Sequence, residues 1–319
     1  MTKTIKDLRK KVFTEDFKKF CKENFNSQME KVENVRIFYL IGASIVFLIM
    51  ITFAVTFIYY LGGKEISKAD VELFALVELA FYGLARWIIK CYKNRAKKII
   101  LKKLLSYVGD FELIDKKTYS EKYSNDDVNY FKELELFSSF NIYNCDDRLI
   151  GTYKNLKLDI IEANLKRESG SGKRRRVVTV FKGLFVKVPF NKKIKSSTIV
   201  LGDKAFPSCK GEKVNLEDPE FEKYFDVYST DQIEARYLLT TAFMDRIVKI
   251  MQKRILGSSL KFSFEKDMLN IAISSSKDWF EIPILEPATK LANYRGIILE
   301  IITILSIIEA LKLDEKTGL

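Results

Sequence analysis

A long run without charge constrains this chain more than any other feature of its sequence. No charged residue occurs from Ile37 to Gly63, where IFYLIGASIVFLIMITFAVTFIYYL is apolar or weakly polar throughout. A helix that rises 1.5 Å per residue needs roughly 20 such residues to cross a ~30 Å hydrocarbon layer. A signal peptide would have an apolar stretch of roughly 7–15 residues near the start. Because 36 residues, six of them acidic, precede this run, we expect a transmembrane helix.

A second apolar segment follows at Val71–Ile89, but its hydropathy alone is ambiguous. It contains Glu72, Glu78 and Arg86, and a charge at mid-membrane costs about 2.5 to 3.5 kcal/mol on insertion scales. The alternative is an amphipathic helix that lies on the membrane or packs in a soluble domain. The linker GGKEISKAD is short and neutral whereas both outer flanks are basic. The positive-inside rule therefore favours a transmembrane helical hairpin over residues 37–89, with both termini in the cytoplasm.

Glu78 lies near mid-bilayer in this predicted hairpin and needs a hydrogen-bond partner. Counting the helical rise from each helix centre puts it at the depth of Thr52, whose hydroxyl can donate to the carboxyl. Gly83 lies near the level of Val46, where a missing side chain would let the helices approach. An intramembrane acid also serves in proton or ion handling. Since a two-helix hairpin offers no pathway, we interpret Glu78 as a structural residue.

Basic residues flank the predicted hairpin on both sides. Residues 1–36 carry ten basic and six acidic side chains, with apolar residues at helical spacing between Ile5 and Val32. This pattern predicts an N-terminal amphipathic helical segment, which either lies on anionic lipid or packs on the folded domain. Residues 90–105 predict a basic juxtamembrane helix, whose cations are either an orientation signal or a headgroup site. Its candidate lipid or phosphate contacts are Lys90, Lys93, Arg95, Lys97 and Lys98.

The placement of charge and the lack of histidine exclude several functions. The net charge is +12, but the residues beyond Lys103 account for only about +2 of it. That is too little for the broad basic face of a phosphate-backbone binder, so we expect no nucleic-acid partner. With no histidine there is no Ser-His-Asp triad and no imidazole metal ligand. The cysteines lack C-x-x-C spacing and are interpreted as reduced thiols: Cys21, Cys91, Cys145 and Cys209.

Residues 106–319 predict one cytoplasmic α+β domain with a largely antiparallel sheet. A short helix is expected over Asp126–Phe137. In LKLDIIEANL two alternating triplets are one residue out of phase, which is typical of a β-bulge near Ile160. Across the turn ESGSGK, alternation from Val178 to Phe190 predicts the second strand of a hairpin, with a bend at Gly183.

Further alternation predicts more strands downstream. A strand is expected at 198–201, and a hairpin should pair residues 260–264 with 269–273 across the turn EKDM. The alternation continues at Phe280, Ile282 and Ile284, which predicts another extended segment.

Two longer helices complete the predicted domain. Asp231 is a good N-cap, and with Glu234 three residues later it forms a capping-box pattern for a helix that ends near Arg254. We expect Arg236 to dock this helix on the sheet. The last helix, about Ala288–Leu313, is interpreted as a long C-terminal core helix and not a third span, because its uncharged run between two glutamates is only about eight residues.

The turn of the first hairpin is basic. Its GSGK at 170–173 lacks the first glycine of a Walker motif and the Ser or Thr after the lysine, so that motif is excluded. The tip is nevertheless a candidate lipid or phosphate contact, with a solvated surface as the alternative; its residues are Lys173, Arg174, Arg175 and Arg176. The acids near Glu217 suggest no nucleophile or metal set. We therefore predict no catalytic, cofactor-binding or metal-binding residue and no cofactor.

Three segments resemble a known family, namely FKGLFVKVPFNKKI (181–194), LEDPEFEKYFDVYSTDQIEARYLLTTAFMDRI (216–247) and GTYKNLKLDIIEANL (151–165). They are similar to the bacterial membrane-protein family of unknown function DUF3137, whose members also begin with a hydrophobic pair, so the likeness covers most of the chain. The resemblance implies a bacterial source and an inner-membrane location. It transfers no catalytic residue, because the family has no established activity, and it suggests a LemA-type membrane protein as a partner.

Two classes of function follow. The first is a membrane-anchored cytoplasmic module that binds lipid or a protein partner, or acts as a scaffold in bacterial envelope organisation. The second is an enzyme that uses carboxylate or metal-carboxylate chemistry at the membrane surface. A pocket with two or more buried acids of raised pKa would favour the enzyme. Exposed apolar residues beside the basic hairpin would favour binding.

Overall fold

The computed structural model describes residues 5–62, 67–114, 116–202, 211–252 and 259–313. The chain divides into two compact units. The sheet unit contains Met1–Arg9, Leu105–Trp279 and Leu299–Leu319, and the helical unit contains Lys10–Leu104 and Phe280–Ile298. The boundary falls inside helix α9 (Leu291–Ala310), which contributes residues to both units. Two residues named in the sequence analysis, Cys209 and Arg254, lie outside the described residues.

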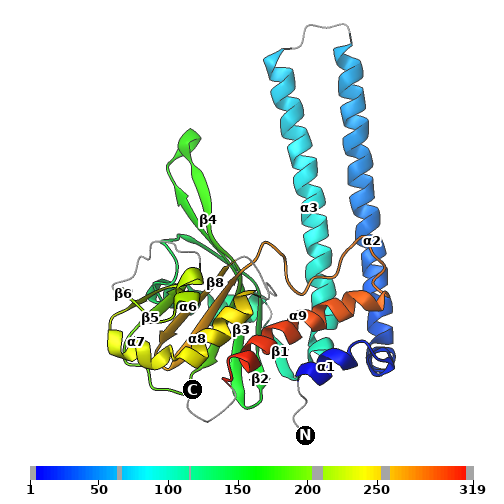
Figure 1. The fold of residues 1–319 in the computed structure, drawn as a ribbon. Helices are drawn as coiled ribbons and strands as arrows, with labels where there is room; N and C mark the ends of the chain where they lie inside the picture. The colour runs from blue at the N-terminus through cyan, green and yellow to red at the C-terminus, as the bar shows by residue number, and fades with distance from the viewer. Residues whose placement is uncertain (1–4, 63–66, 115, 203–210, 253–258, 314–319) are drawn as a thin grey trace. The chain divides into compact units, whose positions relative to one another are not determined.

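Two long helices, α2 (Glu15–Leu61) and α3 (Lys68–Leu105), form most of the helical unit and are blue and cyan in Figure 1. The short helix α1 (Ile5–Lys11) precedes them, so the predicted N-terminal amphipathic segment is interrupted rather than continuous. The apolar stripe of this segment is enclosed by protein, since Phe17, Phe25 and Val32 are at most 2% exposed. Of the two predicted interpretations, packing on protein is the one that the structure shows.

The apolar parts of α2 and α3 pack on each other through aromatic rings. Phe57 stacks on Phe74 with ring centroids 4.3 Å apart. Phe53 contacts the rings of both Phe74 and Phe81, at 5.6 and 6.3 Å. Large rings therefore set the spacing of the two helices.

This aromatic packing contradicts two details predicted from depth alone. The Thr52 hydroxyl donates to the Ile49 carbonyl at 2.9 Å, and Glu78 Oε1 is enclosed without a hydrogen-bond partner among the described residues. No neighbouring atom lies within 4 Å of a Cβ built on Gly83. The predicted Thr52–Glu78 hydrogen bond and the close approach at Gly83 are both wrong, because the helices meet through phenylalanine and not through small residues.

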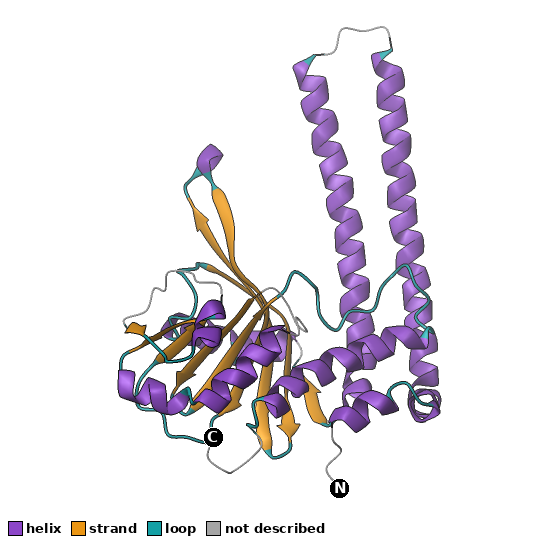
Figure 2. Ribbon diagram, viewed as in Figure 1, coloured by secondary structure: helices purple, strands orange, loops and turns teal. Residues whose placement is uncertain are grey.

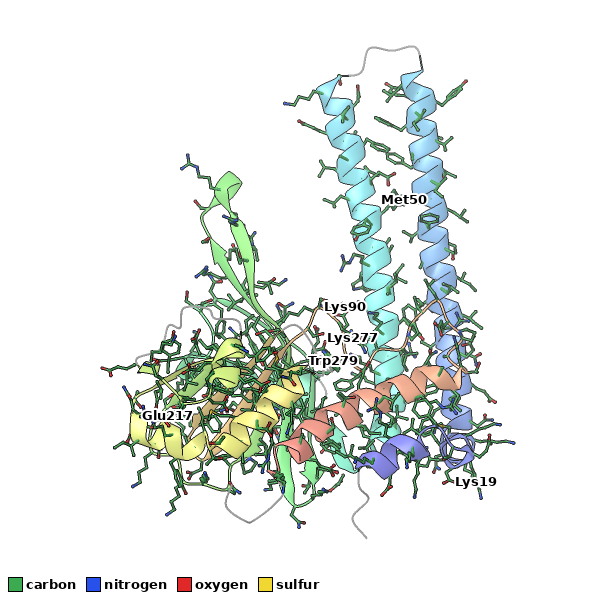
Figure 3. The ribbon with its side chains drawn as sticks, in the orientation of Figure 1. Lys19, Met50, Lys90, Glu217, Lys277 and Trp279 are labelled. Carbon is green, nitrogen blue, oxygen red and sulfur yellow. The ribbon has the colours of Figure 1, made fainter. Side chains whose placement is uncertain are left out.

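Among the described residues, α2 and α9 are the helices long and apolar enough to cross a membrane. Only 6% of the apolar window of α2 is buried, against 50% for α9, and Met50 lies within the uncharged run of α2 (Figure 3). The two apolar stripes of α9 are buried, with Ile301 and Ile302 at most 2% exposed, which confirms the predicted core helix. Helix α3 does not reach the same apolar criterion.

The segment that precedes α9 is coil and not the predicted extended strand. Phe280 and Ile282 are each 1% exposed within the helical unit. Arg36 donates to the carbonyl of Ile284 at 3.0 Å, and the Glu33 carboxylate accepts from the Ala288 amide at 2.6 Å. The alternation at 280–284 therefore reflects a coil that packs on helices, not a strand with one buried face.

Nine strands of the described chain form one sheet, in which each neighbouring pair is antiparallel (Figures 1 and 2). This arrangement confirms the predicted α+β class. In spatial order the strands are β1 (Asp110–Leu113), β2 (Ile142–Tyr153), β3 (Leu156–Ser169), β4 (Arg176–Pro189), β9 (Met268–Ser274), β8 (Ser259–Glu265), β5 (Thr198–Leu201), β7 (Asp226–Ser229) and β6 (Glu212–Val214).

Both predicted hairpins are present, but one detail of the first one differs. The register of β3 is regular at Ile160, and its two irregularities lie farther along. Against β4 the register shifts between Leu165 and Lys166, and against β2 the extra residue is on β2, between Cys145 and Asp147. The two out-of-phase apolar triplets arise because both faces of β3 are buried. Gly183 pairs in register with Ser274 at the end of the β4–β9 ladder. It has φ +151°, and a side chain there would collide with the Ile273 carbonyl.

Helices cover both faces of the sheet. Helices α4 (Lys116–Lys122) and α5 (Ser124–Glu133) lie on one face, where Phe131 packs 4.5 Å from Phe185 between ring centroids. On the other face, Phe243 of helix α8 (Thr241–Gln252) contacts Phe190 and Phe264. The remaining short helices are η1 (Gly172–Arg174), α6 (Pro219–Tyr224) and α7 (Gln232–Leu238).

The predicted capped helix is two helices, since α7 ends at Leu238 and α8 begins at Thr241. Asp231 caps α7 as predicted, because its carboxylate accepts from the amides of Ile233 and Glu234 at 2.8 and 3.0 Å.

We expect Phe185→Ala to destabilise the protein by about 3 to 5 kcal/mol, because this fully buried ring packs against Phe131 and Phe137. Thermal unfolding of the full chain in detergent measures the effect. Val178→Ala, on the same strand but 39% exposed, is the control and should change stability by about 0.5 kcal/mol or less. Equal effects of the two substitutions would contradict this description of the core.

Candidate functional site

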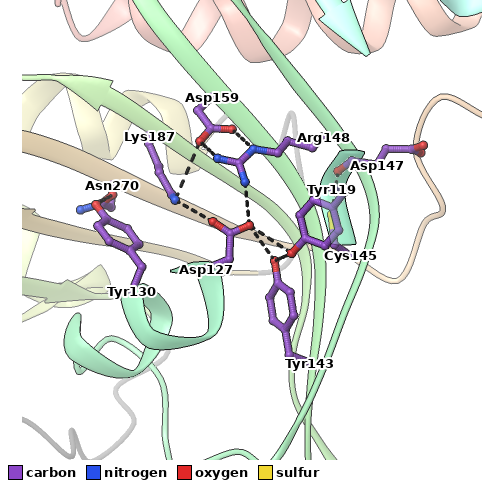
Figure 4. Close-up of polar contacts among 10 residues, drawn as sticks. All are labelled: Tyr119, Asp127, Tyr130, Tyr143, Cys145, Asp147, Arg148, Asp159, Lys187 and Asn270. Carbon is purple, nitrogen blue, oxygen red and sulfur yellow. Dashed lines mark hydrogen bonds and ion pairs between the residues drawn. The ribbon is translucent and has the colours of Figure 1, made fainter. Parts of the chain in front are cut away.

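A buried cluster of charged side chains lies under α5 on one face of the sheet (Figure 4). Asp159 of β3 is the cross-strand partner of Lys187 of β4, which in turn pairs with Asn270 of β9. Arg148 of β2 reaches Asp159 diagonally, and α5 places Asp127 over this row. We call these residues, together with Tyr119, Tyr130 and Tyr143, the charged cluster.

Asp127 is the centre of the charged cluster and is 2% exposed. Its Oδ2 accepts from Arg148 at 2.8 Å, and its Oδ1 accepts from the Lys187 ammonium at 3.1 Å. Tyr143 donates to Oδ2 at 3.3 Å, and Tyr119 donates to the Tyr143 hydroxyl at 2.8 Å. Burial raises the pKa of both tyrosines, so their hydroxyls stay protonated and act as donors.

Arg148 connects the two acids of the charged cluster. Its guanidinium forms a fork on Asp159, with Nε to Oδ1 at 2.9 Å and the second contact at 2.5 Å. Burial raises the pKa of Asp159, against the pull of Arg148 and Lys187. Burial acts against the charge of Arg148, but Asp159 and Asp127 outweigh it and hold the pKa of the guanidinium above its ordinary value.

Aromatic rings cover the two cations. The Arg148 guanidinium lies 4.0 Å from the centroid of Tyr123, and the Lys187 ammonium lies 4.0 Å from that of Tyr130. Tyr130 donates to the Asn270 amide oxygen at 2.7 Å, and burial raises the pKa of this tyrosine to about 12. The cluster is thus formally neutral, with two acids and two bases, each held by several contacts.

The contacts of the charged cluster are those of a structural ion-pair network that stabilises the packing of α5 on the sheet, and not those of a reaction centre. Both carboxylates are engaged by cations, and burial raises the pKa of the nearby Cys145 thiol, which makes it a weak nucleophile. Among the described residues no group of three or more His, Cys, Asp or Glu is placed to hold a metal. Cys21, Cys91 and Cys145 are free thiols.

In the described part of the chain two surface pockets are present, and neither is lined by Asp127 or Asp159. One of about 160 Å³ is bordered by Lys213, Glu222 and Asp226, and there Asp226 is paired with Lys213 at 2.8 Å. The other, of about 150 Å³, lies between α5 and β2 and is bordered by Lys132, Asn141 and the ring of Tyr143. Both are small for a pocket that encloses an organic ligand, for which 300–1,000 Å³ is the usual range.

The structure separates the predicted basic contacts into two groups. Lys93 and Lys97 pair with Glu281 at 3.3 and 2.7 Å, and Lys97 is only 6% exposed, so its charge is used inside the helical unit. The other predicted cations whose side chains are described are exposed, namely Lys90, Arg95, Lys98, Arg174, Arg175 and Arg176. Lys173 lies in η1, and its side chain is outside the described part. The two basic regions belong to different units.

The predicted residues of α7 have structural contacts. Glu234 does not complete a capping box; its carboxylate accepts from the amides of Lys195 and Ser196, which ties the loop before β5 to α7. Burial acts to raise the pKa of Glu234, but the hydrogen bond from the Ser196 hydroxyl, together with those from the two amides, holds the pKa below its ordinary value. Arg236 donates to the carbonyl of Gln232 within α7 and to that of Asn215, the residue after β6.

Comparisons with known proteins agree with the predicted resemblance. Residues 179–313 match the family described as "Protein of unknown function (DUF3137)". Two of the three resembling segments lie inside this range, and 151–165 lies before it. The sequence matched no curated protein. A solved structure, the mycobacterial trehalose monomycolate transport factor A, TtfA, is 10% identical, covers 64% of this chain and 90% of its own, and has a TM-score of 0.30.

We expect Asp127→Asn to lower the free energy of unfolding by about 3 to 5 kcal/mol, because it leaves Arg148 and Lys187 buried beside a neutral amide. Thermal unfolding of the full chain measures the loss, and Asp126→Asn on the exposed side of α5 is the control. Adding Lys187→Met to Asp127→Asn should recover part of the stability, since it removes an unpaired cation. If Asp127→Asn lowered the free energy of unfolding no more than the control does, the charged cluster would not be stabilising the fold.

Proposed function

We propose that this protein, whose residues 179–313 match a family of unknown function, is a membrane-anchored binding module. One observation carries the proposal: α2 holds an apolar window of 18 residues of which only 6% is buried. In water such a surface would be strongly unfavourable, at about 25 cal/mol for each Å² of apolar area. A bilayer removes this penalty, which makes membrane anchoring the natural state of the helix.

The exposed side of α3 supports a hairpin that crosses the bilayer twice. Its large apolar residues are as exposed as those of α2, and they are Val71, Leu73, Leu76, Leu79, Leu84 and Trp87. The aromatic contacts between α2 and α3 hold the two helices together over this stretch. The cost of Glu78 and Arg86 on insertion is offset by this apolar surface, and Arg86 contacts the hydroxyl of Tyr82 at 3.2 Å.

Aromatic residues mark the two ends of the proposed span. Tyr39 and Tyr59 are 20 residues apart on α2, which corresponds to roughly 30 Å of helix, the thickness of the hydrocarbon layer. Tyrosine and tryptophan prefer both membrane interfaces. On α3, the exposed Lys90 is labelled in Figure 3. Trp87 lies three residues before it in the same helix, which fits an interface on the basic side.

The flanking charges assign the sides of the membrane in this proposal. Arg36 precedes the apolar run of α2, and exposed cations follow that of α3 at Lys90, Arg95 and Lys98. By the positive-inside rule both ends of the hairpin face the cytoplasm. We therefore place the protein in the bacterial inner membrane as a multi-pass protein with both termini and the sheet unit on the cytoplasmic side.

Binding is favoured over catalysis by the state of the acids. The enzyme alternative needs carboxylates that are available in an open pocket, whereas Asp127 and Asp159 are both engaged by Arg148. At the pocket of about 160 Å³, Asp226 is paired with Lys213 and Glu222 accepts from the Leu216 amide. Two candidate partners are a protein of the envelope, for which the resemblance suggests a LemA-type protein, and the lipid itself. Co-purification of the full chain in mild detergent is expected to retain a protein partner if the module is a scaffold.

We expect Leu48→Arg to lower the fraction of the chain that is held in membranes, because a charge at the centre of a span costs about 2.5 to 3.5 kcal/mol and adds to the cost that Glu78 and Arg86 already impose on the hairpin. The measurement is the fraction of full chain that remains in the membrane pellet after extraction with alkaline carbonate. Leu285→Arg, which is 82% exposed and outside the proposed span, is the matched control and should stay in the pellet with the wild type. A wild type found in the soluble fraction would disprove the anchor.

A reporter fused to the C-terminus tests the orientation separately. We expect a reporter that works only in the cytoplasm to be active, and one that works only outside to be silent. The opposite pattern would reverse the assigned sides while leaving the anchor intact.

A further inference from the structure

The β3–β4 hairpin extends past the sheet as a two-stranded arm, which is clearest in Figures 1 and 2. On one side the pairing of β3 with β2 ends at Lys166, and on the other the pairing of β4 with β9 begins at Gly183. Beyond these residues, β4 is the strand with which β3 pairs. The Asn141 side chain donates to the Glu168 carbonyl and accepts from the Glu168 amide, which fixes the part of the arm nearest the sheet. We call residues 166–179 the basic arm.

The basic arm carries surface chemistry that the fold does not use. It has one acidic residue, Glu168, and its six basic residues are Lys166, Arg167, Lys173, Arg174, Arg175 and Arg176. Val177 and Val178 are 48% and 39% exposed. An arm without a third strand or a buried face contributes little to stability, so neither the cations nor the two valines are explained by packing.

The end of the arm has a defined shape. Gly170 has φ +79°, where a side chain would collide with the Arg174 carbonyl, and η1 closes with a 3.2 Å hydrogen bond from the Arg175 amide to Gly172. The Arg175 guanidinium is paired with Glu168 at 2.7 Å. Within the described part of the chain, Arg174 and Arg176 have no acidic partner and are exposed. The turn therefore presents two available guanidinium groups beside two exposed valines.

We propose that the basic arm binds anionic phospholipid headgroups at the bilayer surface, an inference that rests on the proposed membrane anchor. Arg174 and Arg176 would contact phosphate, for which guanidinium groups offer paired donors. Val177 and Val178 would lie against the boundary between headgroups and acyl chains. Charge and apolar surface side by side are what an anionic membrane interface requires of a small element.

Two features favour lipid over nucleic acid as the partner. The arm has no aromatic residue on which a base could stack, and the excess of cations is local and not spread over a broad face. The chain also carries its own apolar anchor. Because the arm belongs to the same chain as this proposed anchor, the anionic lipid would be at a high effective concentration, so that a weak contact of a few charges suffices.

Vesicle capture tests the proposal with the full chain. The protein is placed in nanodiscs of phosphatidylcholine and floated with separate vesicles of phosphatidylcholine, alone or mixed with phosphatidylglycerol. We expect capture by the anionic vesicles only, and a loss of about tenfold or more for Arg174→Glu with Arg176→Glu, since each basic residue contributes strongly at such a surface. The control reverses two other exposed cations of the sheet unit, Lys157→Glu with Lys223→Glu, and should bind within about twofold of wild type.

Each outcome has a distinct meaning. Equal binding to neutral and anionic vesicles, or an equal loss in the arm variant and the control, would overturn the inference. Tighter binding of a short RNA than of anionic vesicles, lost in the same arm variant, would overturn it in favour of a nucleic-acid partner. If the chain inserts into nanodiscs but the arm variant binds normally, only this inference fails. If the chain does not insert at all, the proposed anchor itself fails.

Discussion

The ion pairs of Asp127 hold the α5 face of the sheet together. A sheet covered by helices on both faces must pair every charge that it buries, because an isolated ion in that interior would cost several kcal/mol. Asp127 of α5 contacts both Arg148 and Lys187, which lie on two different strands, and Asp159 supplies the second negative charge that these two cations need. The same contacts fix the position of α5 over the sheet, and with it the packing of Phe131 against Phe185.

The sequence predicted the elements whose patterns depend on local physics. The Asp231 cap, both hairpins and the core helix α9 follow from side-chain spacing that a strand or helix alone can satisfy. The predictions that failed concern segments whose conformation depends on packing against elements far away in the sequence. A β-bulge near Ile160 was inferred from a phase change, which arises because a second layer of helices buries the other face. Phe280 and Ile282 alternate without pairing to any strand, since the helical unit buries both.

The charged cluster was missed for the same reason. Asp159, Lys187 and Asn270 each interrupt an apolar strand with a polar residue, and such residues ordinarily face solvent in an antiparallel sheet. The three residues are cross-strand neighbours on the face that α5 covers, and this can be recognised only when the strand pairing and the position of α5 are known. A sequence signal did exist, because Asp127 lies in the first turn of a predicted helix, but its charged partners Arg148 and Lys187 lie more than 20 residues away in the chain.

Neutralisation of the buried charges has a consequence for the surface. Because the charges of Asp127, Arg148, Asp159 and Lys187 cancel, this buried cluster adds no net charge to the sheet unit, and the local excess of cations on the basic arm comes from the arm's own residues. Screening limits the reach of these cations to about 8 Å at physiological salt, so the arm acts only on an anionic surface that is already close. The proposed anchor would keep a bilayer at a high effective concentration around the arm, whereas the same arm on a freely diffusing domain would rarely meet a membrane. In this proposal the anchor and the arm depend on each other, because a few cations with so short a range bind an anionic surface only when the rest of the chain holds them in its neighbourhood.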